Sequence, residues 1–162
     1  MKTVRVGVVG LGWFGEKHLQ ILSQLPNVEV VAVCSRTESR AKEVAKRYAV
    51  KKWYSDWDKL ARDPEVDAVT VATHLPDHRK PVVAAAEAGK DVFVEKPLCL
   101  TLEELAAIEA VLAAPGAPLL MVGFNRRFHP SVVEIRNRKA DGRLGSVVAM
   151  VGQHTTSTQA FV

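Results

Sequence analysis

The stretch TVRVGVVGLGWFG, residues 3–15, joins a valine-rich run to a glycine-rich turn, and it decides the fold class. Its first seven residues are mostly β-branched, which is typical of a strand buried on both faces. Its last six residues, GLGWFG, fit the pattern G-x-G-x-x-G, and apolar residues with helical spacing follow over residues 13–25. Strand, turn and helix in this order predict the first unit of a dinucleotide-binding fold.

The three glycines of this turn have separate predicted roles. Gly10 permits the tight turn, Gly12 the close approach of a pyrophosphate, and Gly15 the packing of the helix on the strand. Free N–H groups at the helix start and the positive end of its dipole would hold the phosphates. We also place Trp13 and Phe14 at the cofactor, although Trp13 either covers the pyrophosphate or packs against a neighbour.

Strand and helix patterns alternate along most of the chain. Further strands are predicted at VEVVAVC (28–34), VDAVTVA (66–72), DVFV (91–94) and PLLMV (118–122). Further helices are predicted at residues 37–47, 76–88 and 101–113. This order predicts an α/β fold, namely a Rossmann-type, doubly wound parallel sheet with right-handed crossovers.

The pattern changes after Pro130. A helix is expected at residues 131–140, and SVVAMVGQH (146–154) is expected to be a strand that has no partner of its own. We therefore expect a Rossmann domain at residues 1–125. Residues 126–162 are expected to form a linker helix and the first strand of a truncated second α+β domain. The unpaired strand favours a homodimer or a swapped assembly.

Composition excludes several classes of protein. Lys and Arg number 22 against 18 Asp and Glu, and this small excess forms no dense basic stripe, so no nucleic-acid partner is expected. The N-terminus has a strand pattern rather than that of a signal peptide, and no apolar run approaches membrane-spanning length. Cys34 and Cys99 form no CxxC pair. We expect a cytoplasmic protein with neither a membrane partner nor a metal site.

The end of the second predicted strand bears on cofactor choice. An NAD-preferring fold would place a carboxylate there for the ribose 2′-hydroxyl, whereas this chain has Ser35 and Arg36. A serine hydroxyl and a guanidinium both bind a 2′-phosphate. We therefore predict NADP as the preferred cofactor, with NAD possible. The alternative is that Arg36 is simply a solvated loop residue.

Four segments together resemble one known family. They are GLGWFGEKH (10–18), VATHLPDH (71–78), EAGKDVFVEKPL (87–98) and VGFNRRFHP (122–130). In order and spacing they resemble the Gfo/Idh/MocA family, which includes glucose–fructose oxidoreductase, inositol dehydrogenase and a rhizopine-catabolism protein. The resemblance implies a nicotinamide-binding Rossmann domain, followed by an α/β domain that contacts the substrate and forms oligomers.

The resemblance also implies roles for individual residues. Lys96 of the EKP motif resembles the family's active-site lysine, which binds the substrate hydroxyl and assists the proton transfer that accompanies hydride transfer. Glu95 would hold the cofactor or the lysine, and Pro97 would follow a cis peptide. Thr73 and His78 match a loop that lies against the cofactor.

Asn125 and Arg126 resemble residues near the nicotinamide and the entrance to the second domain. The loop after residues 66–72 departs from the family pattern at His74 and Leu75, where the family commonly has proline and a small polar residue. The family's second domain also supplies an Asp and a His opposite the lysine, and no match to them occurs in these 162 residues. His154 is expected to be an ordinary strand residue.

Two functions from different classes follow. The first is the N-terminal, cofactor-binding half of an NAD(P)-dependent oxidoreductase that acts on a sugar, cyclitol or related polyol. By itself this half would bind cofactor without efficient turnover. The second is a stand-alone NADP(H)-binding module. A nucleotide-type fold that binds some other ligand is the third alternative.

Overall fold

The computed structural model describes residues 2–152 of the protein. The chain divides into two compact units between Phe124 and Asn125. The first unit contains a six-stranded sheet and the helices that cover it. The second unit contains two short helical segments and the residues that follow them.

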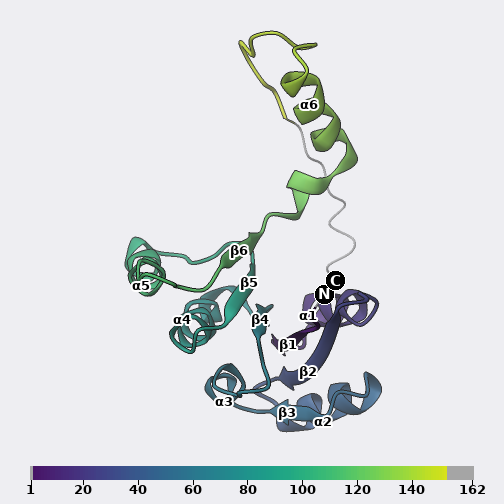
Figure 1. Cartoon of the computed structure of the whole chain (residues 1–162), viewed down its shortest axis with the longest axis vertical. Helices are drawn as coiled ribbons and strands as arrows, with labels where there is room; N and C mark the ends of the chain where they lie inside the picture. Colours follow the sequence, from purple (N-terminus) through teal and green to yellow (C-terminus); the bar gives the residue numbers. More distant parts are fainter. Residues whose placement is uncertain (1, 153–162) are drawn as a thin grey trace. The chain divides into compact units, whose positions relative to one another are not determined.

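All strands of the first unit are parallel neighbours in the order β3-β2-β1-β4-β5-β6 (Figure 1). They are β1 (Val4–Val9), β2 (Val28–Cys34), β3 (Lys52–Tyr54), β4 (Ala68–Val71), β5 (Asp91–Glu95) and β6 (Leu120–Gly123). The chain adds strands on one side of β1 up to β3 and on the other side from β4 onward. Ligands bind at such a switch point in open α/β sheets. The predicted Rossmann-type, doubly wound parallel sheet is confirmed.

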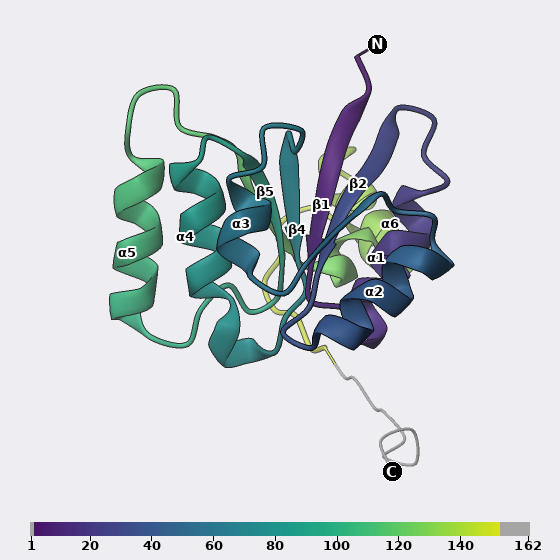
Figure 2. The same cartoon turned by 90° about the horizontal axis from the view of Figure 1, so that it is seen from below.

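Helices cover both faces of this sheet. They are α1 (Trp13–Leu22), α2 (Glu38–Arg47), α3 (Trp57–Ala61), the 3-10 helix η1 (Leu75–Asp77), α4 (Arg79–Glu87) and α5 (Leu102–Leu112). Figure 2 shows α3, α4 and α5 side by side, away from α1 and α2. Successive strand residues face opposite sides, so Val8 packs with Leu19 of α1, whereas Val9 packs with Leu60 of α3.

The sequence patterns missed β3 and α3. Three and five residues are too few to show a period, and β3 is defined by its pairing with β2, with Ala32 opposite Lys52. The sheet consequently has six strands instead of the expected five. The longer elements match their predicted ranges closely. At the start of α5, the Thr101 hydroxyl caps the helix by accepting a hydrogen bond from the Glu104 N–H at 3.1 Å.

The second unit contains the 3-10 helix η2 (Asn125–Phe128) and α6 (Pro130–Ala140). Residues 146–152 form no strand, so the expected strand at 146–154 is absent from its described part; Gln153 and His154 lie outside the described residues. A strand needs a partner for its backbone hydrogen bonds, and this unit offers none over residues 125–152. Over residues 2–152, no helix has both the length and the apolar character needed to cross a membrane.

Candidate functional site

A cleft of about 660 Å³ lies at the carboxyl ends of β1, β2, β4 and β5. Parallel strands end together at this edge, and the residues that follow β3 join them, so five separate segments of the chain form one site. Ten of the predicted site residues line the cleft: Gly10, Gly12, Trp13, Phe14, Ser35, Arg36, Thr73, His78, Glu95 and Lys96. The sequence-based choice of segments therefore corresponds to one continuous surface.

Two of the three glycines are required by the fold itself. Gly10 has a φ of +94°, and a Cβ there would lie 2.5 Å from the Ala72 carbonyl oxygen. A Cβ at Gly15 would lie 1.8 Å from the Gly10 carbonyl oxygen, although Gly15 itself does not line the cleft. The predicted tight turn and close helix packing are both present at these positions.

Gly12 differs from the other two. Its φ is −76°, which any residue adopts, and a Cβ there would meet nothing within 4 Å. Gly12 is the N-cap of α1, so the first N–H groups of that helix lack partners within the helix. Open space therefore lies beside the N-terminus of α1, where the helix dipole and the unpaired N–H groups favour an anion.

Trp13 and Phe14 form the rim of this end of the cleft. Their rings meet edge to face with centroids 4.8 Å apart, and the side chains stay 69% and 46% exposed. Lys17 places its ammonium 5.8 Å from the centroid of the Trp13 ring. Trp13 therefore packs against a neighbour and also lines the cleft.

The end of β2 supplies Ser35 and Arg36. The Ser35 hydroxyl accepts a hydrogen bond from the Thr37 N–H at 3.3 Å. The exposed Arg36 guanidinium lies 3.3 Å from a carboxylate oxygen of Asp77, which comes from η1. The sequence places no acidic residue at this strand end, yet the fold brings one to it from the loop after β4.

His78 holds the loop after β4 to the EKP motif. It is 1% exposed, with Nδ1 2.8 Å from the Pro97 carbonyl oxygen and Nε2 2.9 Å from the Thr73 carbonyl oxygen. A neutral imidazole has one N–H and can donate to only one of these oxygens at a time. The Thr73 hydroxyl donates to the Asp77 carbonyl at 3.1 Å. His78 therefore supports the cleft wall from behind.

The end of β5 carries Glu95 and Lys96. His18 of α1 places Nε2 2.9 Å from Oε1 of Glu95, and both side chains are mostly buried. The Lys96 side chain is exposed and lines the cleft, and the peptide between Lys96 and Pro97 is cis, as predicted. A fixed carboxylate thus lies beside a lysine that remains available to a ligand.

Cys34, the last residue of β2, lines the cleft as a buried thiol. Burial raises the pKa of its thiol to about 12, with a smaller contribution from Asp56. The reactive form of cysteine is the thiolate, which this environment disfavours. Among the described residues, no group of His, Cys, Asp and Glu is suited to hold a metal ion.

Asn125 and Arg126 belong to η2 of the second unit, and their role at the cofactor stays a prediction. The sequence reasoning also missed cleft residues, among them Ser55 and Trp57, which follow the unpredicted β3. A signal for His18 was present in GLGWFGEKH, but its partner Glu95 lies 77 positions away. Local patterns do not reveal such pairs.

The chain is 35% identical over 150 residues to scyllo-inositol 2-dehydrogenase (NAD(+)) of Bacillus subtilis, covering 92% of this chain and 44% of that protein. It is 39% identical over 145 residues to inositol 2-dehydrogenase of Acidothermus cellulolyticus, covering 89% and 42%. The chain thus spans less than half the length of these relatives.

A solved structure of scyllo-inositol dehydrogenase from Lactobacillus casei, with bound NAD(H) and scyllo-inositol, superposes with a TM-score of 0.84 at 27% identity. The match covers 90% of this chain and 43% of that one. Residues 4–124 match the family model described as an oxidoreductase family with an NAD-binding Rossmann fold. The chain therefore belongs to the Gfo/Idh/MocA family of oxidoreductases, whose NAD-binding Rossmann fold it carries.

Proposed function

We propose that this chain is the cofactor-binding part of an NAD(P)-dependent oxidoreductase that oxidises a hydroxyl of a sugar, cyclitol or related polyol. An inositol is the first substrate to test, because the relatives named above are inositol dehydrogenases. The alternative of a stand-alone dinucleotide-binding module shares the same cleft and differs only in turnover. Two free cysteines and the lack of a basic stripe support a cytoplasmic protein without a nucleic-acid partner.

One observation supports dinucleotide binding above the others. Gly10 and Gly15 are explained by contacts within the protein, whereas no contact among residues 2–152 requires glycine at position 12. The open space beside its Cα adjoins the N-terminus of α1 and the cleft. A pyrophosphate that approaches the backbone closely accounts for this glycine.

The residues at the other end of the cleft suit alcohol oxidation. A bound nicotinamide supplies the acceptor for a hydride from the carbinol carbon. Lys96, on the exposed end of the EKP motif, binds the substrate hydroxyl and relays the proton that must leave its oxygen. Glu95, held by His18, fixes the backbone position from which Lys96 extends. His78 fixes Pro97 on the other side of that lysine.

For the adenosine end we propose a preference for NADP over NAD. Ser35 and Arg36 line the cleft at the end of β2, and both are suited to a 2′-phosphate. The paired Asp77 carboxylate partly offsets this charge, and the B. subtilis relative has a name that specifies NAD. Calorimetric titration with NADP⁺ and NAD⁺ decides the matter, and equal or tighter binding of NAD⁺ would reject the preference.

The test of dinucleotide binding compares two glycine substitutions. Gly12→Val should leave the fold intact, because its backbone is unstrained and its Cβ is unobstructed. It should nevertheless raise the Kd for NAD⁺ and NADP⁺ about a hundredfold or more by blocking the pyrophosphate. Gly10→Ala should instead lower the free energy of unfolding by about 2 kcal/mol, because of its positive φ and the Ala72 carbonyl. Unchanged dinucleotide affinity in Gly12→Val would refute the proposal.

Turnover separates the enzyme from the binding module. We expect dinucleotide reduction in the presence of myo- or scyllo-inositol from a longer form of the protein that includes a substrate domain. This chain by itself should bind the dinucleotide without efficient turnover. If no form that contains the chain oxidises a polyol although dinucleotides bind, the binding-module alternative is favoured.

A further inference from the structure

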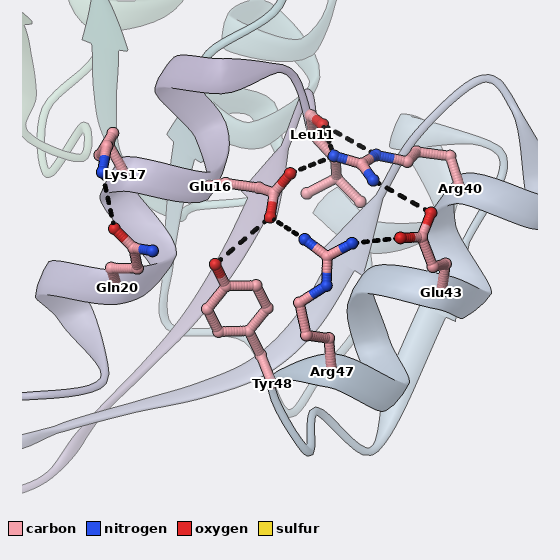
Figure 3. Close-up of polar contacts among 8 residues, drawn as sticks. All are labelled: Leu11, Glu16, Lys17, Gln20, Arg40, Glu43, Arg47 and Tyr48. Carbon is pink, nitrogen blue, oxygen red and sulfur yellow. Dashed lines mark hydrogen bonds and ion pairs between the residues drawn. The ribbon is translucent and has the colours of Figure 1, made fainter.

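A cluster of charged side chains lies behind the glycine-rich turn, on the side of α2. It consists of Glu16 from α1 with Arg40, Glu43 and Arg47 from α2, and the hydroxyl of Tyr48 joins it (Figure 3). We refer to these five residues as the charge cluster. Glu16 is the centre, since Arg40, Arg47 and Tyr48 all donate hydrogen bonds to its carboxylate.

Arg40 differs from the rest of the charge cluster because it reaches the turn itself. Its Nε and Nη2 both donate to the Leu11 carbonyl oxygen, each at 3.3 Å, while the same guanidinium pairs with Glu16 and Glu43. Arg47 pairs with the same two carboxylates. Over residues 2–152, Arg47 makes no hydrogen bond to the turn.

The turn has three other contacts. The Gly10 N–H donates to the Cys34 carbonyl at 2.9 Å, the Gly12 carbonyl accepts from the Glu16 N–H at 3.0 Å, and the Leu11 side chain is buried at 4% exposure. None of these contacts is made by the N–H or carbonyl of the peptide between Leu11 and Gly12. In a trans peptide the carbonyl and the N–H point in opposite directions. Arg40 therefore sets the orientation of this peptide by holding its oxygen on the α2 side.

We propose that Arg40 is a positioning residue for the pyrophosphate: it keeps the Leu11 carbonyl turned away from the phosphates and so presets the turn for a dinucleotide. This role rests on the function proposed above. If the Leu11 carbonyl faced the cleft, its partial negative charge would repel the phosphates beside Gly12. The contact acts before the ligand arrives, so it improves affinity by reducing the reorganisation that binding requires.

The net charge of the charge cluster does not account for the proposed effect of Arg40 on dinucleotide binding. Two guanidiniums face two carboxylates, so the charge cluster as a whole is neutral and adds little long-range attraction for an anion. The pKa of Arg40 is raised, first by its hydrogen bond to Glu43, and it stays protonated. What distinguishes Arg40 from Arg47 is the contact with the turn, and this difference supplies a matched control.

The experiment compares Arg40→Met with Arg47→Met in the whole chain. Each variant loses one positive charge and its ion pairs with Glu16 and Glu43, but only Arg40→Met loses the donors to Leu11. Calorimetric titration with ADP-ribose should show a Kd about tenfold higher for Arg40→Met and within about twofold of the wild type for Arg47→Met. Adenosine, which has no phosphate, should bind both variants as it binds the wild type in an NMR titration.

Equal weakening of ADP-ribose binding by both substitutions would overturn the role, because loss of charge would then suffice. A folded Arg40→Met variant with wild-type affinity would also overturn it. If Arg40→Met does not fold, Arg40→Lys decides: it keeps the charge without the fork, and its Kd for ADP-ribose should rise about threefold while that for adenosine stays constant. No ADP-ribose binding by the wild-type chain would instead refute the proposed function.

Discussion

The two edges of the sheet use their charged side chains differently. At the amino edge, Asp67 and Asp63 are bound closely by Arg5 and Lys52, with nitrogen–oxygen distances of 2.7 Å and 2.8 Å. At the carboxyl edge, Lys96 is exposed and Arg36 is 78% exposed. The amino-edge carboxylates are therefore bound within the fold, whereas the Lys96 and Arg36 side chains at the carboxyl edge stay accessible to a ligand.

This difference has a physical basis in the fold. Asp63 accepts a hydrogen bond from Lys52 on each of its two oxygens, one from the Tyr54 hydroxyl and one from the Glu65 N–H, so no acceptor capacity is left for an outside group. At the carboxyl edge, His18 pairs with Glu95 and His78 contacts the Pro97 carbonyl, whereas the Lys96 side chain between them stays exposed. Substitutions at the amino edge should therefore change stability, and those at the carboxyl edge should change binding or turnover.

The largest expected effect concerns Lys96. In a form of the protein that turns over a polyol, Lys96→Met should reduce kcat about a hundredfold or more, because the proton of the substrate hydroxyl loses its relay. Cofactor Kd and thermal stability should change little, since the side chain is exposed. Steady-state kinetics, calorimetry and thermal unfolding measure the three quantities. Retained turnover would show that Lys96 does not relay the proton. It would also contradict the assignment of the carboxyl edge to binding and turnover.

At the amino edge, Asp63→Ala should lower the free energy of unfolding by about 2–3 kcal/mol, because it leaves the Lys52 ammonium and the Tyr54 hydroxyl without their shared partner. Urea unfolding measures this change. Asp58→Ala serves as the control, since Asp58 pairs with Arg62 on the surface and should contribute less than about 0.5 kcal/mol. Loss of dinucleotide affinity in a folded Asp63→Ala variant would contradict the assignment of this edge to stability.

The Arg5–Asp67 pair should make stability depend on pH. Hydrogen bonds from the Arg5 side chain and then from its backbone N–H hold the pKa of Asp67 well below its usual range. The stabilisation is therefore fully present above the unfolded-state value of about 3.9 and is lost as pH falls below it. Urea unfolding should show Asp67→Asn to be about 1 kcal/mol less stable near pH 7. The gap should narrow toward about pH 3, and a constant gap would show that ionisation of Asp67 is not its cause.

The smallest expected effect concerns Asp77 at the carboxyl edge. Asp77→Asn removes the charge that faces Arg36, an exposed pair with little intrinsic strength. The ratio of the NAD⁺ Kd to the NADP⁺ Kd should rise about threefold, because Arg36 is released toward a 2′-phosphate. Arg36→Ala should shift the same ratio in the opposite direction. If neither substitution changes the ratio of the two Kd values, Arg36 is a solvated loop residue with no part in cofactor choice.

The sequence predicted the fold wherever a local pattern was long enough. The glycine-rich turn after a valine run located the first unit, and the spacing of later runs located the remaining long elements. It did not reveal Lys52–Tyr54 or Trp57–Ala61, which are too short to show a period. It also predicted a strand that the described residues 146–152 do not form, because a β-branched run specifies strand character but cannot supply a partner.

The site was predicted as a set of strand ends, and ten of the predicted residues share one cleft. Their interactions were not predictable. His18 pairs with Glu95, Arg36 with Asp77, and Arg40 with the Leu11 carbonyl, across 77, 41 and 29 positions of the chain. Local sequence periodicity carries no information about contacts across such separations. The sequence therefore predicted the residues of the cleft but not the hydrogen bonds and ion pairs that hold them in place.

The amino-acid sequence by itself determined the alternation of strands and helices, because this alternation depends on local backbone geometry and on the burial of neighbouring side chains. Tertiary structure alone decided which charges are paired and which face a ligand. The order of strands, β3-β2-β1-β4-β5-β6, places the ends of β2 and β4 on either side of β1. That order depends on long-range packing, and it leaves Gly12 open and Lys96 exposed at the same edge.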